Sequence, residues 1–194
     1  MTPRQSFIKT LYPTIMTISG WFKGSKDFRE NKEQAKPLQS IFDLSFTSIT
    51  NEEIALKAFA GKQLLLVNTA SDCGFTPQLK ELQLLHDRYK DTLVVIGFPS
   101  NDFKEQETGS NSEIDSFCKV NYGVEFLLSN KVVVRHTEGQ HPVFQWLTQS
   151  SKNGWNPHEP SWNFTKYLVN ADGILIHVFG PTVGPLSNKL ISKL

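Results

Sequence analysis

Two apolar runs on either side of a helical pattern constrain the fold of this 194-residue chain more than any other feature. Residues 64–67 and 93–98 have the length and flanks of buried strands, whereas residues 78–89 place leucines at helical spacing. Strands alternate with helices in this half of the chain, and a hairpin and a last helix are predicted further on. This order predicts an α/β fold with a central mixed β-sheet flanked by helices.

Shorter predicted elements surround this core. A turn signal at residues 170–173, between two apolar runs, predicts the hairpin. The other predicted elements are, in chain order, an N-terminal hairpin or edge strand at 40–49, a capped turn or short helix at 50–59, a helix at 112–120, a strand at 132–134, a helix at 141–148, the hairpin strands at 167–169 and 174–179, and a helix at 186–194.

Composition narrows the classes of function. With 39% hydrophobic and 20% charged residues, the chain is typical of a single globular domain. Its net charge of +1 gives no field that attracts nucleic acid. The two cysteines are too few for a disulfide-rich scaffold but suffice for one redox pair. The histidines are scattered and no phosphate-binding or dinucleotide-binding motif occurs, so we expect neither a metal site nor a bound cofactor.

Residues 1–36 form a predicted N-terminal extension ahead of a domain at 37–194. Apolar side chains from Phe7 to Phe22 share one helical face, interrupted at Pro13, and the stretch is too short to span a bilayer. The extension carries seven basic and three acidic residues, a net charge of +4. Two interpretations stay open: the segment lies on an anionic membrane surface, or it docks on the protein's own core.

Cys73 occupies the junction between the first buried strand and the helix that follows it. Thr76 is the predicted N-cap of that helix and Pro77 its first residue. Unpaired N–H groups and the helix dipole favour an anion at such a junction, so we expect a lowered pKa for the Cys73 thiol. The alternative is that Cys73 is a small buried hydrophobic residue.

Four stretches of the chain resemble signatures of the glutathione peroxidase family. Residues 68–76 read N-T-A-S-D-C-G-F-T, which is similar to the active-site signature N-V-A-S-x-C/Sec-G-x-T. Residues 97–111 resemble G-F-P-C-N-Q-F-x-x-Q-E-P-G-S-N, and residues 162–169 resemble W-N-F-x-K-F-L-V. Residues 117–124 resemble the helix that carries the second cysteine of thioredoxin-dependent members. The resemblance extends over residues 38–194 and leaves out the extension.

The resemblance implies a thioredoxin-like fold and an antioxidant peroxidase that reduces hydrogen peroxide and organic or lipid hydroperoxides in the oxidative stress response. It also implies that Cys73 is the peroxidatic nucleophile, with Gln106, Trp162 and Asn163 completing the site. Their amide and indole groups are neutral hydrogen-bond donors, which suits an oxygen that develops negative charge as the peroxide bond breaks. Cys73 would become a sulfenic acid.

Cys118, 45 positions after Cys73, is implied to be the resolving cysteine. It would attack the sulfenic acid and form a redox-active disulfide, which thioredoxin rather than glutathione would reduce. The short stretch from Leu147 to Trp162 is similar to that of monomeric or weakly dimeric members with an open site. We expect a cytoplasmic protein, with peripheral membrane contact through residues 1–36 as an open alternative.

Five residues depart from the family pattern: Asp72, Ser100, Asp102, Thr108 and Leu127. Asp72 matters most, because a carboxylate pointing at the sulfur raises the pKa of the thiol and slows its attack. Two further functions stay open. One is a peroxide sensor or redox relay that passes its oxidation to a partner protein, and the other is a non-catalytic thioredoxin-like binding domain.

Overall fold

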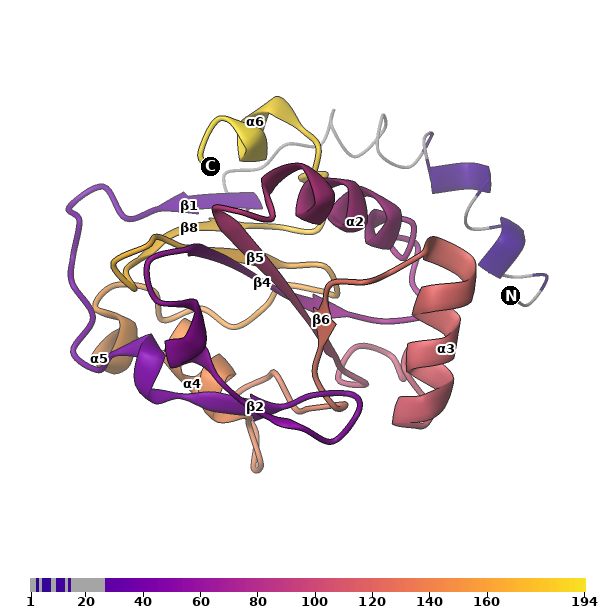
Figure 1. The fold of residues 1–194 in the computed structure, drawn as a ribbon, viewed down its shortest axis with the longest axis horizontal. Helices are drawn as coiled ribbons and strands as arrows, with labels where there is room; N and C mark the ends of the chain where they lie inside the picture. Colours follow the sequence, from indigo (N-terminus) through magenta and orange to yellow (C-terminus); the bar gives the residue numbers. More distant parts are fainter. Residues whose placement is uncertain (1–2, 4, 8–9, 13, 15–26) are drawn as a thin grey trace.

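A mixed β-sheet of six strands forms the centre of the protein, in the order β1-β8-β7-β4-β5-β6 (Figure 1). The structure is a computed structural model that describes residues 3, 5–7, 10–12, 14 and 27–194. The central strand β4 (Gln63–Thr69) runs parallel to β5 (Leu93–Pro99) and antiparallel to β7 (Lys166–Val169). The predicted α/β architecture with a mixed sheet is therefore confirmed.

Short strands and helices complete the fold. The β7–β8 hairpin forms as predicted inside the main sheet. An N-terminal hairpin also forms outside it, but its second strand, β3, lies beyond the predicted residues 40–49. The other elements are, in chain order, β1 (Phe28–Glu30), the 3-10 helix η2 (Ile41–Asp43), β2 (Ser45–Thr47), β3 (Glu53–Ala55), the 3-10 helix η3 (Leu56–Phe59), α2 (Gln78–Tyr89), α3 (Asn111–Tyr122), β6 (Leu127–Leu128), α4 (Pro142–Thr148), α5 (Ser150–Asn153), β8 (Leu175–Phe179) and α6 (Asn188–Ile191).

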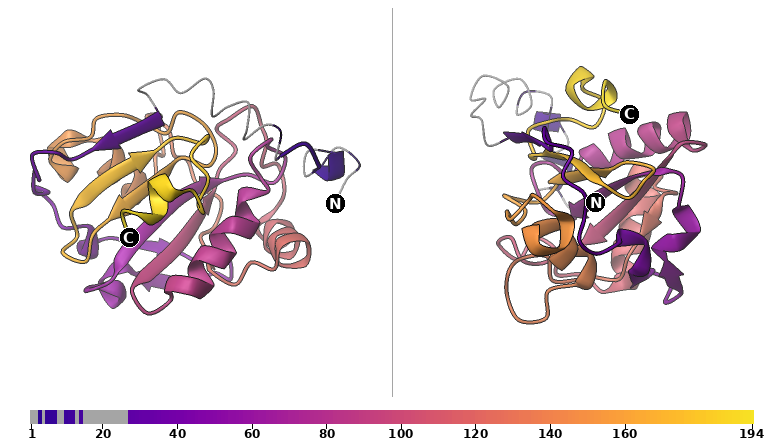
Figure 2. Two further views of the ribbon diagram at one scale, coloured as in Figure 1. Left: turned by 90° about the horizontal axis from the view of Figure 1, so that it is seen from above. Right: turned by 90° about the vertical axis from the view of Figure 1, so that its left-hand side faces the viewer.

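Alternate residues of β4 face two separate hydrophobic layers. Leu65 and Val67 pack in the layer that contains α2, α3 and α6, whereas Leu64 and Leu66 pack in the layer that contains η2, β2 and α4. Figure 2 shows α2 and α4 on opposite sides of the sheet. Because both faces are covered, the strand is apolar at every position from 64 to 67, which is why it was predictable from the sequence.

The predicted strand at residues 132–134 does not form. Val133 makes only an isolated bridge with Gln140, and the short strand β6 lies earlier in the chain, beside β5. The Asp102 carboxylate accepts hydrogen bonds from the backbone N–H groups of Val134, at 2.6 Å, and Arg135, at 3.0 Å. These N–H groups therefore have a side-chain partner in place of a neighbouring strand.

The start of α2 also differs from the prediction. Pro77 is the N-cap and α2 begins at Gln78, without a side-chain cap. The Thr76 hydroxyl instead donates to the Ala70 carbonyl, at 2.8 Å, and accepts from the Cys73 N–H, at 3.0 Å. Thr76 thus closes the loop before the helix, because a short hydroxyl side chain competes for nearby backbone groups.

Two other predicted elements take a different form. Residues 50–59 contain β3 and η3, since Ile54 pairs across the hairpin with Phe46. The last helix is limited to α6, because Ser187 occupies its N-cap in an extended conformation. The predicted helix at 112–120 extends slightly further and forms α3, with a capping box between Ser110 and Glu113.

Part of the predicted extension belongs to the main sheet. β1 pairs with β8 at the sheet edge, while the division of the chain at residue 36 stays a prediction. Tyr12 is buried and its hydroxyl donates to Glu81 Oε1 of α2 at 2.8 Å. Phe7 and Leu11 are exposed.

The helical face predicted from Phe7 to Phe22 includes residues 8–9, 13 and 15–22, which lie outside the described residues. In the part of the chain that the structure describes, no helix has the length and apolar character needed to cross a membrane.

Candidate active site

Cys73 lies in a tightly held loop between β4 and α2. Its side chain is only 1% exposed, and the backbone N–H of Phe75 donates to Sγ at 3.4 Å. The loop is closed from within by Thr76 and from outside by Gln106, whose carbonyl accepts the N–H of Asp72 at 3.0 Å. Cys73 is thus fixed at the carboxyl end of the central strand.

The structure brings the four residues of the predicted site together. Hydrogen bonding from the Trp162 and Asn163 side chains lowers the pKa of the Cys73 thiol, so both side chains lie beside the sulfur. Asn163 Nδ2 also donates to Gln106 Oε1 at 3.0 Å. Gln106 comes from the loop after β5, and Trp162 and Asn163 come from the turn before β7. Three separate loops at one end of the sheet therefore build the site.

The pKa of the Cys73 thiol is raised, so the expected lowering is wrong for this state of the protein. Burial of the sulfur is the main cause, because it disfavours the thiolate. Hydrogen bonds from Phe75, Trp162 and Asn163 lower the pKa but do not outweigh burial. The Asp72 charge raises the pKa, as predicted, and is the smallest of these effects.

Strained backbone flanks the polar groups of the site. Lys104 and Glu105 both have φ of +52°, directly before Gln106. Phe164, directly after Asn163, has φ of +64° although it is bulky and fully buried. Left-handed conformations at such residues carry a cost that only surrounding structure sustains, and they concentrate at functional sites. No sequence pattern predicted these left-handed backbone conformations.

A hollow of about 360 Å³ opens beside the Cys73 loop. It is lined by Gln5, Ser71, Asp72, Gln106, Glu107, Thr108, Gly109, Glu113, Ile114 and Phe117. Three carboxyl groups line it, and the hollow therefore disfavours anionic molecules.

Glu107 is a buried carboxyl that sequence reasoning missed. It is 2% exposed, and burial raises its pKa to about 7. The Ser71 hydroxyl donates to Glu107 Oε2 at 3.1 Å. The resemblance included this glutamate in a motif but attached no role to it, and its burial depends on tertiary packing.

Aromatic and basic side chains cover the outer side of Trp162. The Phe103 and Trp162 rings lie 5.3 Å apart, and Lys104 Nζ lies 5.9 Å from the Trp162 ring centre. Both contacts help to fix the position of the indole.

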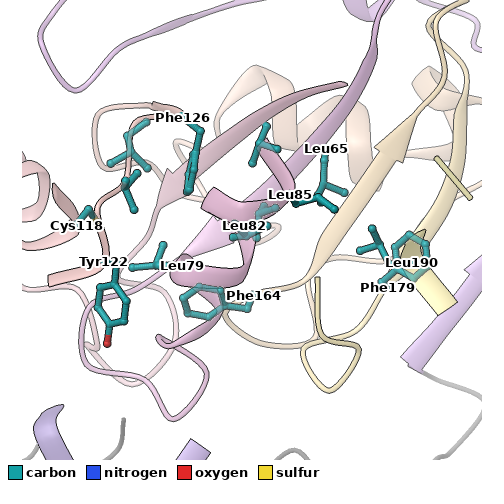
Figure 3. Packing of buried hydrophobic residues seen from close by; sticks show 14 of the residues in the cluster. Leu65, Leu79, Leu82, Leu85, Cys118, Tyr122, Phe126, Phe164, Phe179 and Leu190 are labelled. Atoms are coloured by element: carbon teal, nitrogen blue, oxygen red, sulfur yellow. The ribbon is translucent and has the colours of Figure 1, made fainter. Parts of the chain in front are cut away.

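Cys118 lies on the inner face of α3, away from solvent. It is 2% exposed in the hydrophobic layer formed with α2, and Figure 3 shows it near Tyr122 and Leu79. Burial, with the charges of Glu107 and Asp115, raises the pKa of its thiol to about 12. Both cysteines are free thiols, so the structure represents a reduced state.

The fold and this site define a thioredoxin-like thiol oxidoreductase, in which a cysteine at the carboxyl end of a central strand faces neutral donors. Matching solved structures share this fold. The sequence model of the family "Glutathione peroxidase" matches residues 41–148, and the chain belongs to that family. It is therefore a thiol peroxidase.

Known proteins of similar sequence and structure agree with this assignment. A glutathione peroxidase homolog BsaA of Halalkalibacterium halodurans is 45% identical over 151 residues, covering 77% of this chain and 95% of the relative. The hydroperoxy fatty acid reductase gpx1 of Synechocystis is 41% identical over 157 residues, covering 78% and 92%. The crystal structure of apo Trgpx has a TM-score of 0.59 and 31% identity, covering 79% of this chain and 95% of that one.

The described residues contain no group of three or more histidine, cysteine or acidic side chains arranged to hold a metal ion. The polar groups around Cys73 are amides and an indole, which suit hydrogen bonding to oxygen rather than metal ligation.

Proposed function

We propose that Cys73 reduces hydroperoxides directly and that Cys118 completes the reaction. Cys73 Sγ attacks one peroxide oxygen, the O–O bond breaks and an S–O bond forms. The thiol proton passes to the departing oxygen, which leaves as water or an alcohol. The observation that carries this proposal is that Trp162 and Asn163 lower the pKa of the Cys73 thiol from beside the sulfur, with Gln106 hydrogen-bonded to Asn163.

The buried amide of Asn163 provides both a donor and an acceptor for the peroxide. Its Nδ2 faces Gln106, while its Oδ1 is buried and has no hydrogen-bond partner among the described residues. Such an orphan acceptor carries a desolvation cost that a bound O–H group would remove. We infer that Asn163 Oδ1 accepts a hydrogen bond from the peroxide O–H and orients the O–O bond toward the sulfur.

The proposed substrates are hydrogen peroxide and organic hydroperoxides, lipid hydroperoxides included. The relative named as a hydroperoxy fatty acid reductase supports the inclusion of lipid hydroperoxides, the bulkiest of these substrates. The hollow beside the Cys73 loop is large enough for several atoms of an alkyl chain. Its described lining includes Ile114 and Phe117 but not Cys73 itself.

In the proposed second step Cys118 attacks the sulfenic sulfur, an S–S bond forms and water leaves. A reduced dithiol then opens the disulfide and is itself oxidised. We propose thioredoxin as this reductant. Glutathione is anionic, and the carboxyl groups of Asp72 and Glu113 around the hollow disfavour it.

The direct test is peroxide consumption with thioredoxin, thioredoxin reductase and NADPH. Cys73→Ser should abolish turnover. Cys118→Ser should abolish turnover with thioredoxin yet leave a single oxidation of Cys73 to the sulfenic acid. Ser116→Ala, on the exposed face of the same helix, is the matched control and should be unaffected. Full turnover in Cys118→Ser, or no Cys73–Cys118 peptide in the mass spectrum of the oxidised protein, would contradict the mechanism.

The raised pKa of Cys73 favours a second candidate, a peroxide sensor or relay, because a protonated thiol reacts slowly. Stable mixed disulfides between Cys73 and a partner, with little turnover, would support that candidate. Absence of any sulfenic acid after peroxide treatment would instead support a non-catalytic binding domain.

We also propose a cytoplasmic protein that is a monomer or weak dimer and contacts membranes peripherally through residues 1–36. Support for membrane contact comes from the exposed pair Phe7 and Leu11, one helical turn apart, and from the net charge of +4 of this segment. Tyr12 docks on α2 at the same time, so the two interpretations of the segment are compatible.

A further inference from the structure

Asn68 is a fully buried amide that the reaction itself does not use. It lies near the end of β4, five residues before Cys73, and is 0% exposed. A buried asparagine in a central strand is costly unless all of its polar atoms are paired. Its partners therefore show what the residue holds in place.

All partners of Asn68 outside its own sheet pairing with β5 lie in the turn that carries Trp162 and Asn163. Asn68 Nδ2 donates to the Trp162 carbonyl at 3.1 Å, and Oδ1 accepts the N–H of Thr165 at 3.1 Å. The Asn68 carbonyl accepts the N–H of Phe164 at 2.6 Å. One residue thus spans the whole turn from 162 to 165.

The turn needs such support because its backbone is strained. Phe164 has φ of +64° between the two hydrogen bonds that Asn68 makes through its side chain. The Thr165 hydroxyl donates to the same Trp162 carbonyl at 2.9 Å. This carbonyl is therefore held by two donors, and the direction of the Trp162 and Asn163 side chains follows from its position.

We propose that Asn68 is a positioning residue that holds Trp162 and Asn163 against the Cys73 sulfur. It links β4, which leads into the Cys73 loop, to the turn that supplies the donors. The inference rests on the proposed function, because positioning matters only if these donors act on Cys73. Removal of Asn68 should release the Trp162 carbonyl and relax Phe164, which moves both donors away from the sulfur.

Asn153 provides a matched control elsewhere in the fold. It is also 0% exposed, and its Nδ2 donates to the carbonyls of Trp146 and Asn156, both at 2.8 Å. Its Oδ1 accepts the N–H groups of Trp155, at 2.9 Å, and Asn156, at 2.7 Å. Loss of either asparagine should cost similar stability, but only Asn68 contacts the turn beside Cys73.

The test compares Asn68→Ala with Asn153→Ala in the full chain. Asn68→Ala should lower the second-order rate constant for oxidation of Cys73 by hydrogen peroxide about 10- to 100-fold. It should also move the pH profile of Cys73 alkylation by iodoacetamide upward, because Trp162 and Asn163 lower the pKa of the thiol. Asn153→Ala should lower Tm to a similar degree and leave both measurements unchanged.

Asn68→Asp should make the oxidation rate of Cys73 depend on pH in a way that a simple loss of stability would not. A protonated aspartic acid can donate to the Trp162 carbonyl, whereas the carboxylate cannot. The rate of this variant relative to the wild type should therefore rise as the pH falls. If Asn68→Ala does not fold, Thr165→Val, which removes the other donor to that carbonyl, should still reduce the rate several-fold.

Wild-type rates in Asn68→Ala or in Thr165→Val would overturn the inference, as would equal losses in the Asn68 and Asn153 variants. Failure of the proposed function has a different signature, because the wild-type Cys73 would then resist peroxide. The alkylation profiles of the variants would still decide whether Asn68 positions the donors.

Discussion

At Cys73 two opposing effects set the state of the thiol. Burial raises its pKa, and three hydrogen-bond donors partly offset that rise. Because the sulfur is only 1% exposed, it is protected from non-specific oxidation in the absence of substrate. The consequence is that the thiol proton must leave as peroxide enters, so binding and deprotonation are coupled in the proposed reaction.

The negative charge of Asp72 makes this deprotonation harder. Asp72→Asn should lower the pKa of Cys73, because a like charge beside the thiolate is removed. We expect alkylation of Cys73 at neutral pH to accelerate about two- to fivefold. The measurement is the alkylation rate from pH 6 to 10, and Asp91→Asn, an exposed change just after the carboxyl end of α2, is the control. An unchanged profile would mean that Asp72 does not act on the sulfur in solution.

Lys166 makes stability depend on pH. It is fully buried, where Nζ donates to Gln78 Oε1 at 2.8 Å and to the Gly180 carbonyl at 3.2 Å, and burial lowers its pKa to about 7. Between this value and the pKa of an unfolded lysine, near 10.4, the unfolded chain binds one more proton. The free energy of unfolding therefore rises with pH in that window, by at most about 1.4 kcal/mol per pH unit.

Lys166→Met removes this contribution. As pH rises from 7 to 9, the unfolding free energy of the wild type should increase relative to that of the variant. Urea unfolding at each pH measures it, with the exposed Lys57→Met as control. Parallel pH curves for the wild type and Lys166→Met would show that Lys166 stays protonated when buried.

Among the elements, α3 carries the buried cysteine that has to reach Cys73 in the proposed reaction. It is fixed at its start by the capping box of Ser110 and Glu113 and at its end by Gly123, which has φ of +65°. Between these ends Cys118 faces the core. Cys73 belongs to the same hydrophobic layer as Cys118. A disulfide brings two sulfurs to about 2 Å and their Cα atoms within about 7 Å, so α3 has to unwind locally where the reduced fold holds the two cysteines farther apart.

We expect oxidation to unwind α3. Amide hydrogen exchange across residues 111–122 should speed up by at least about tenfold after one equivalent of peroxide, because local unfolding exposes its amides. Exchange in α2 serves as the internal control and should change little. Cys118→Ser treated in the same way should keep the slow exchange. Identical amide hydrogen exchange of α3 in the reduced and oxidised protein would contradict this prediction.

Elements with a regular hydrophobic pattern were predictable from the sequence, and those that depend on distant partners were not. β4, β5, α2 and the β7–β8 hairpin follow the periodicity of their side chains. β1 is only three residues long, half-buried throughout, and pairs with β8 about 150 residues later. At the site, Cys73 was singled out by its position, while the partners of its sulfur came from family resemblance alone. The burial of Glu107 and the backbone of Phe164 depend on packing that no local pattern encodes.

At the scale of the whole molecule, the described N-terminal residues lie beside the Cys73 loop and α2. Gln5 Nε2 donates to the Ser71 carbonyl at 3.4 Å, and Tyr12 contacts α2. Figure 1 shows the first described residues near α2 and α3. A membrane held by this segment would therefore lie close to the opening of the hollow, where lipid hydroperoxides would be presented.

Replacement of both Phe7 and Leu11 by serine should abolish co-sedimentation with vesicles of anionic phospholipid. The wild type should bind these vesicles, weakly at high salt, because exposed apolar side chains and basic residues act together. Leu38→Ser, which removes a 78% exposed leucine elsewhere, is the control and should bind normally. Equal binding to vesicles by all three proteins, or no binding by the wild type, would exclude a lipid-anchoring role for this segment.

The burial of Cys118 also separates the two halves of the proposed cycle in time. Before peroxide arrives, a reductant that collides with the protein meets an intact α3 and no disulfide. The surface that it must recognise exists only in the oxidised protein. If thioredoxin is the reductant, as we propose, its reduced form would not be sequestered by enzyme that has met no peroxide. The demand on the cell's thiol pool would then follow the peroxide supply rather than the abundance of this protein.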